Sequence, residues 1–247
     1  MEALAGFTVI QIAVAMLATF FSAFIRGLTG FGMAILLVPV LALALLPVEA
    51  VLITNFLALF IGLSEIKRLV RDAEKSAWAI GGLVAIATPP GLWLLTMTGP
   101  DLARFIIALV ALSAFCIILL PKRGEITHGP AVTGGVGITS GLLTGFAGMP
   151  GPPVVPYYVG RELPRHVATA SMLLIFTIAA AVGLSAGAGL GELAIGQLWL
   201  SLALFPAVLI GNWSGARVAG RISDPVWRIC VGVVLGGAAI AALVRLL

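Results

Sequence analysis

The chain has 247 residues, of which 61% are hydrophobic and 10% are charged. Its mean hydropathy is +1.18. Soluble domains carry about 25% charged residues, so this composition cannot cover a water-facing surface and predicts a multi-pass membrane protein. The net charge of +4 is attributed to basic loops beside the membrane and not to nucleic-acid binding.

Ten apolar stretches follow one another, separated by charged or turn-forming residues. The first half is predicted to hold segments 7–25, 31–46, 48–66, 76–97 and 102–120, and the second half segments 130–146, 150–160, 165–187, 196–216 and 226–246. Two pairs, 7–25 with 31–46 and 130–146 with 150–160, are joined by glycine- or proline-rich sequence without a charged loop. Each pair is expected to be either a re-entrant hairpin or two short spans, since irregular backbone at membrane depth needs cover from protein or a water-filled cavity.

The two broken pairs recur at an offset of 117 residues. At this offset Pro39 meets Pro156, Pro47 meets Pro164, Pro89 meets Pro206, and Thr54 meets Ser171. Among fourteen prolines, about 0.4 coincidences are expected by chance at any one offset, so three indicate a duplicated unit. The predicted fold is an all-α polytopic membrane protein made of two inverted repeats of about five segments each. The repeats are 1–121 and 130–247, joined by a cytoplasmic hinge loop at 122–129.

Lysine and arginine predict the orientation in the membrane. If the segments alternate in direction, the basic loops at 67–75, 122–128, 161–165 and 217–224 all fall on one side, which the positive-inside rule makes the cytoplasm. Both termini then lie outside the cytoplasm. Because each half holds five segments, the second half is inverted relative to the first, and inverted repeats bind substrate near the midplane at the repeat interface.

Enzyme chemistry finds no support in the residues. His128 and His166 lie in loops without partners at metal-ligand spacing, and no histidine lies in a membrane segment where it could act as a base. No phosphate-binding loop of the Gly-x4-Gly-Lys type is present. The chain is therefore expected not to be an enzyme and to need no metal or cofactor.

The breaks at 29–33 and 148–153 are the candidate binding elements. A helix that starts there presents unpaired N–H groups and the positive end of its dipole, and two facing starts would hold an anion without a buried lysine. Pro150, Pro152 and Pro153 suit a helix start, where the missing N–H is not needed. The alternative is close packing of small residues between helices.

Polar side chains near the breaks complete the predicted site, each with a structural alternative. Arg26 either attracts and binds substrate or extends to water at the cytoplasmic end of its segment. Thr54, Asn55, Thr169 and Ser171 either donate to an anion or bond between helices. The predicted substrate-binding residues are Arg26, Thr29, Gly30, Phe31, Gly32, Met33, Thr54, Asn55, Gly148, Met149, Pro150, Gly151, Pro152, Pro153, Thr169 and Ser171.

Two weaker polar candidates lie outside that set. Asn212 lies near the inner end of its segment. Glu65 is expected to pair with Arg68 at the cytoplasmic edge, with proton coupling as its alternative role.

With these motifs, nearly the whole chain resembles the TauE/SafE family of bacterial membrane proteins. The family pattern is a glycine-rich run that closes on a proline, followed by a second proline and a polar patch, once in each half. The first copy runs from Gly30 to Pro39, then to Pro47 and Thr54; the second runs from Ala147 to Pro156, then to Pro164 and Ser171. Both copies depart from the Gly-Gly-Gly form, with Gly-Met-Ala in one and Pro-Gly-Pro in the other.

The resemblance implies a secondary transporter in the bacterial cytoplasmic (inner) membrane. Such a protein would export a small sulfur-containing anion such as sulfite, an organosulfonate or thiosulfate. The expected partners are this small anion and the lipid bilayer, and a homodimer is a candidate assembly because inverted-repeat carriers often pair. The alternatives are a passive anion channel and a membrane scaffold subunit that binds no ligand.

Overall fold

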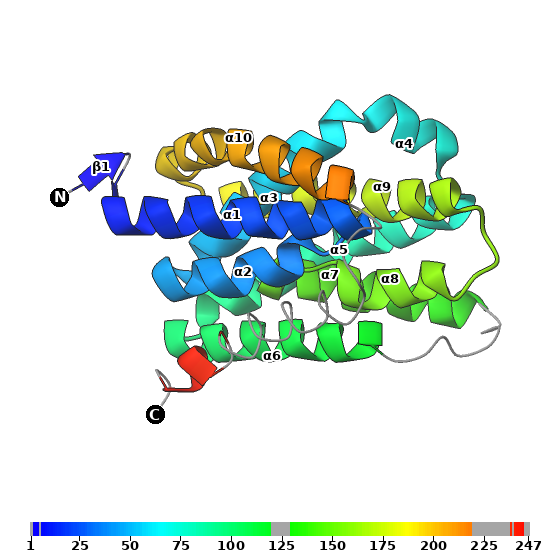
Figure 1. Ribbon diagram of the computed structural model, residues 1–247. Coiled ribbons are helices and arrows are strands. Elements are labelled where there is room, and N and C mark those ends of the chain that lie inside the picture. The colour runs from blue at the N-terminus through cyan, green and yellow to red at the C-terminus, as the bar shows by residue number, and fades with distance from the viewer. Residues whose placement is uncertain (1, 5, 120–128, 219–237, 239, 245–247) are drawn as a thin grey trace.

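The computed structural model describes residues 2–4, 6–119, 129–218, 238 and 240–244. Most of these residues form helices (Figure 1). Where all-α was expected, a two-stranded antiparallel ribbon of β1 (Glu2–Leu4) and β2 (Phe7–Thr8) precedes the first helix. The helices are α1 (Val9–Thr29), α2 (Met33–Ala44), α3 (Pro47–Ser64), α4 (Ile66–Asp72), α5 (Lys75–Met97), α6 (Pro100–Leu119), α7 (Pro130–Ala147), α8 (Gly151–Val159), α9 (Arg165–Gly189) and α10 (Ile195–Val218).

The helices match nine of the predicted segments within a few residues because their ends carry local signals. Thr8 caps α1 by accepting a hydrogen bond from the Gln11 N–H, and the Gln11 side chain bonds back to the Thr8 N–H. Pro47 and Pro130 occupy the first turns of α3 and α7. The predicted segment 226–246 and the hinge at 122–129 lie largely outside the described residues.

Helix α4 corrects the loop predicted at 67–75. The stretch is rich in charge, yet Leu69 is fully buried and packs in a cluster with Ala170 and Leu174 of α9. Arg68 also pairs with Glu65 at helical spacing. One apolar anchor and one ion pair are enough to order a short helix in a segment whose composition indicates a loop.

Six of the described helices are long and apolar enough to cross a bilayer: α1, α3, α5, α6, α9 and α10. Helices α2 and α8 have only 12 and 9 residues. At 1.5 Å per residue, neither can span a hydrocarbon core of about 30 Å alone. The outer surface is apolar, with Ile10 and Ile86 76% and 74% exposed, as expected for side chains that face lipid.

Two helix pairs approach closely through glycine. Helix α1 lies along α10, where a Cβ added to Gly215 would come within 2.1 Å of the Phe24 carbonyl oxygen. Helix α5 lies along α7, where a Cβ on Gly145 would come within 2.1 Å of the Thr88 carbonyl oxygen. Small residues thus bring backbones together, as is usual between membrane helices.

Two of the basic links meet at one end of the molecule. Both terminal nitrogens of Arg161, in the α8–α9 link, donate to the Glu74 carboxylate before α5, at 2.6 and 2.8 Å. The Glu74 N–H donates to Ser171 of α9. Helix α7 begins and α8 ends at this end of the molecule. Helix α1 begins and α2 ends at the opposite end, beside the N-terminus (Figure 1).

Candidate site between two helix breaks

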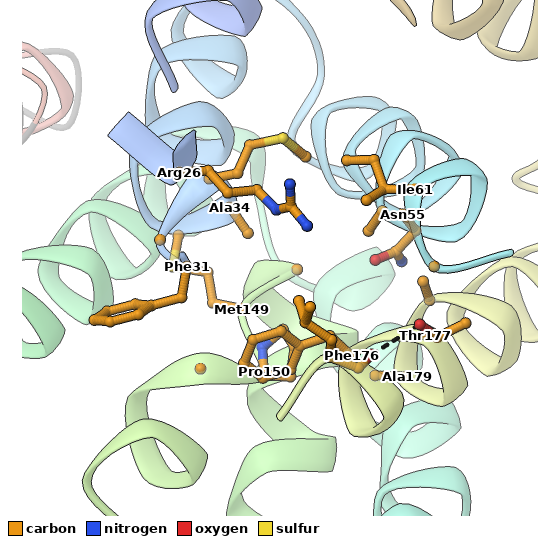
Figure 2. A pocket seen from close by; sticks show the side chains of 18 of the residues that line it. Arg26, Phe31, Ala34, Asn55, Ile61, Met149, Pro150, Phe176, Thr177 and Ala179 are labelled. Carbon is orange, nitrogen blue, oxygen red and sulfur yellow. Dashed lines mark hydrogen bonds between the residues drawn. The ribbon is translucent and has the colours of Figure 1, made fainter. Parts of the chain in front are cut away.

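The α1–α2 break and the α7–α8 break line one cavity (Figure 2). Its volume is about 80 Å³, enough for a small anion or several waters, since one water needs about 10–15 Å³. The remaining walls come from α3 and α9. Nine of the sixteen predicted site residues line it: Arg26, Phe31, Gly32, Met33, Asn55, Gly148, Met149, Pro150 and Gly151.

Left-handed glycines and a threonine shape the first break. Gly30 and Gly32 have φ of 89° and 94°, a conformation that other residues rarely adopt. The Thr29 hydroxyl lies 2.7 Å from the Phe31 carbonyl oxygen and accepts a bond from the Phe31 N–H at 3.3 Å. Helix α2 then begins at Met33, and its first amides lie at the cavity without an acceptor among the described residues.

The second break contains one left-handed glycine and three prolines. Gly148 has φ of 64° and its N–H donates to the carbonyl of Thr144. The Ser140 hydroxyl donates to the Pro150 carbonyl at 2.6 Å and fixes the turn. Because Pro152 and Pro153 have no N–H, the first turn of α8 offers the cavity only the N–H of Gly151.

Arg26 is buried, with 9% of its surface exposed, and its guanidinium points into the cavity (Figure 2). It does not extend to water, which was the alternative reading of its position. Its Nη1 donates to the side-chain oxygen of Asn212 on α10 at 2.8 Å. The remaining guanidinium N–H groups have no partner among the described residues.

Glu65 lies at the edge of the cavity, beside the link between α3 and α4. Its carboxylate is paired with Arg68, as predicted. Arg68 therefore holds the carboxylate that lines the cavity, and Arg26 is left without a carboxylate partner among the described residues.

Asn55 supplies an amide from the middle of α3. It is 3% exposed and its side chain lies at the cavity (Figure 2). Its side-chain nitrogen has no hydrogen-bond partner among the described residues and lies against Gly183 of α9, where an added Cβ would be 2.5 Å away. A buried donor without a partner costs about 1–3 kcal/mol. Thr177 of α9 also lines the cavity, but its hydroxyl already donates to the Leu173 carbonyl at 2.7 Å.

The structure does not bring seven predicted residues to the cavity wall. They are Thr29, Gly30, Thr54, Pro152, Pro153, Thr169 and Ser171. Thr29, Gly30, Pro152 and Pro153 are part of the two breaks but do not line the cavity. Thr54 is buried with an unpartnered hydroxyl, Thr169 donates to the Arg165 carbonyl, and Ser171 joins α9 to the start of α5.

The apolar wall of the cavity, formed by α3 and α9, was not predicted from the sequence. On α3 the spacing of Asn55, Ala58, Gly62 and Glu65 places these residues on one face, and on α9 Leu173, Phe176, Thr177 and Ala180 do the same. The one sequence signal for this wall is the presence of small residues at helical spacing from Asn55. Such spacing is also common where helices simply pack together, so it does not single out a site. No group of three His, Cys, Asp or Glu side chains among the described residues could hold a metal.

Residues 15–242 match the model of the family described as sulfite exporter TauE/SafE. Neither the curated proteins nor the solved structures compared with the chain gave a match. Helices long and apolar enough to span a membrane, packed around a buried cavity, define a multi-pass membrane protein. The chain belongs to the TauE/SafE family, whose members are transporters of the bacterial cytoplasmic membrane and not enzymes.

Proposed function

We propose that the chain exports a small sulfur-containing anion from the cytoplasm and binds it in the cavity between the two breaks. The observation that carries the proposal is the convergence on that cavity of donors that have no acceptor among the described residues. They are the Arg26 N–H groups not bound to Asn212 and the first amides of α2, and the Asn55 amide lies at the same wall. An anion that loses its water needs such donors, and a helix start adds a favourable dipole.

The polarity of the wall favours an organosulfonate over sulfite or thiosulfate. The donors come from α1, α2 and α3, whereas α8 and α9 contribute Val155, Leu173 and Phe176. An anion with oxygen or sulfur on every side would leave some acceptors against apolar carbon, which is costly. An organosulfonate can direct its oxygens to Arg26 and its carbon substituent to Phe176.

The shape of the cavity supports a carrier over a passive channel. It extends along α3 from Asn55 to Glu65 and reaches Leu69 at the end that bears the basic links. On the other side of Asn55, Leu52 and Ile53 are fully buried. This closed packing fits a carrier open toward the predicted cytoplasmic side.

Inverted repeats are part of the proposal, and the helix pairing supports them. At an offset of 117 residues, α1 corresponds to α7 and α5 corresponds to α10. Helix α1 packs along α10 and α7 packs along α5, so each half provides one broken hairpin and one helix that receives the hairpin of the other half. Rocking of the two halves around a site held between them is how such repeats alternate access.

Two experiments test the proposal. Proteoliposomes should show saturable flux of an alkanesulfonate, and the purified protein should gain thermal stability with alkanesulfonates but not with neutral dimethyl sulfone. A non-saturable, purely electrogenic current would favour a channel, and the absence of both flux and stabilisation would favour a scaffold. Cysteine labelling should place 67–75 in the cytoplasm, and cross-linking in membranes tests the expected homodimer.

A further inference from the structure

Asn212 lies outside the cavity wall but holds the arginine that points into it. Helix α10 comes so close to α1 that a Cβ added to Gly27 would lie 2.2 Å from the backbone oxygen of Asn212. This contact allows the Asn212 side-chain oxygen to reach Arg26 Nη1 at 2.8 Å. Without it, a long and flexible side chain would be free to turn toward water or toward Glu65.

The partner of Arg26 is neutral. None of the ion pairs among the described residues includes Arg26. Glu65, the carboxylate at the edge of the cavity, is paired with Arg68 instead. Among the described residues, the cavity therefore has one positive charge without a direct counter-ion, and a carboxylate at position 212 would neutralise it.

A single positive charge matches a singly charged anion. Transfer of an ion out of water costs far more for a double charge than for a single one. The part of the cavity wall that the structure describes has no second cation to offset this cost. We infer that Asn212 is a positioning residue that sets the charge of the site and thereby makes it selective for singly charged anions over doubly charged ones. This inference rests on the proposed function and narrows its substrate class to singly charged sulfonates.

Two substitutions separate charge from positioning. Asn212→Asp has nearly the same shape and keeps the hydrogen bond to Arg26, but it neutralises the site. Asn212→Ala loses the hydrogen bond and keeps the charge. If charge decides binding, Asp should lower affinity for methanesulfonate by at least about tenfold and Ala by only about threefold. If Asn212 only orients Arg26, the order of the two variants reverses.

The control is Gln11→Glu. Position 11 is on the same helix as Arg26 but 15 residues away, and the capping box that Gln11 forms with Thr8 accepts either residue. This variant adds the same charge to the protein and should bind methanesulfonate as the wild type does. Thermal midpoints without ligand should agree within a few degrees for all four proteins.

Binding is measured by ligand-induced thermal shift and by titration calorimetry, with methanesulfonate and acetate as singly charged anions and with sulfate and thiosulfate as doubly charged ones. The wild type should bind methanesulfonate at least about tenfold more tightly than sulfate. Preference for sulfate, or undiminished binding by Asn212→Asp, overturns the inference. A wild type that binds none of the anions overturns the proposed function itself, and a preference for acetate would assign the site to carboxylates instead of sulfonates.

Discussion

The two helix breaks share a position in the fold but differ in the chemistry they bring to the cavity. The α1–α2 break supplies Arg26 and the first amides of α2, which have no acceptor in the described part of the chain, whereas prolines leave the α7–α8 break with the N–H of Gly151 alone. The residue that corresponds to Arg26 at the repeat offset is Leu143. If the two halves are repeats, as proposed, they share the positions of the helix breaks, while charge and donors are concentrated in the first half. The second half contributes mainly a shaped apolar wall.

Loss of Arg26 should give the largest effect. Arg26→Met removes the one positive charge that the described residues place at the cavity, and it is expected to lower sulfonate flux in proteoliposomes by at least about 100-fold, since several charge-assisted bonds are lost. Arg71→Met is the matched control, because Arg71 is exposed on α4 and pairs with Asp72. Comparable flux in both variants would mean that the first break carries no special chemistry.

The second break should matter through its shape. A Cβ on Gly151 would make ordinary contacts of 3.8–3.9 Å with Phe176, Val155 and Ile35, so Gly151→Ala should keep most of the flux. Gly151→Val places branched methyl groups in the cavity and should reduce flux by about tenfold or more, while the protein stays folded. If Val transports as well as Ala, the anion does not approach this break.

Asn55 should show an intermediate effect without loss of stability. Asn55→Leu removes an amide at the cavity whose nitrogen has no partner among the described residues, so affinity should fall by about 1–3 kcal/mol while the thermal midpoint stays level or rises. Thr54→Val removes a buried hydroxyl that lacks a partner in the same described part of the chain but lies off the cavity, and it should leave affinity unchanged. A drop in midpoint for Asn55→Leu, with normal affinity, would reveal a bond between helices.

The smallest effect is expected from the prolines. The double variant Pro152→Ala with Pro153→Ala returns two N–H groups to α8 but should change affinity by less than about twofold, because neither residue reaches the cavity. Its stability should fall by about 1–2 kcal/mol through greater freedom of the unfolded chain. A tenfold gain in affinity would show that the second break can bind the anion once donors are restored.

The sequence predicts the helices and the breaks well because both depend on local signals. Charges and turn residues mark the helix ends, and runs of glycine and proline mark the breaks. The orientation of side chains is harder to predict. Neighbours on a helix point about 100° apart, so Asn55 faces the cavity while Thr54 does not, although both belong to the same polar patch.

The other features that the sequence did not predict depend on contacts between distant segments. The pairing of Arg26 with Asn212 depends on how closely α1 and α10 approach, which neither segment reveals alone. Ser171 lies at the predicted repeat offset of 117 residues from Thr54, yet its hydroxyl accepts a bond from the Glu74 N–H at the start of α5. The apolar wall of α9 is made of residues such as Phe176 and Ala180. The same residue types also form ordinary contacts between helices, so the sequence does not mark them as part of a site.

The contact between α1 and α10 also has a consequence for synthesis. Arg26 and Asn212 are separated by 186 residues, so at about 5–20 residues per second the ribosome needs about 10–40 s to deliver the partner of Arg26. Until then Arg26 lacks its Asn212 partner. A chain that ends before α10 would keep this arginine unsupported in an otherwise apolar helix, which is costly inside a membrane.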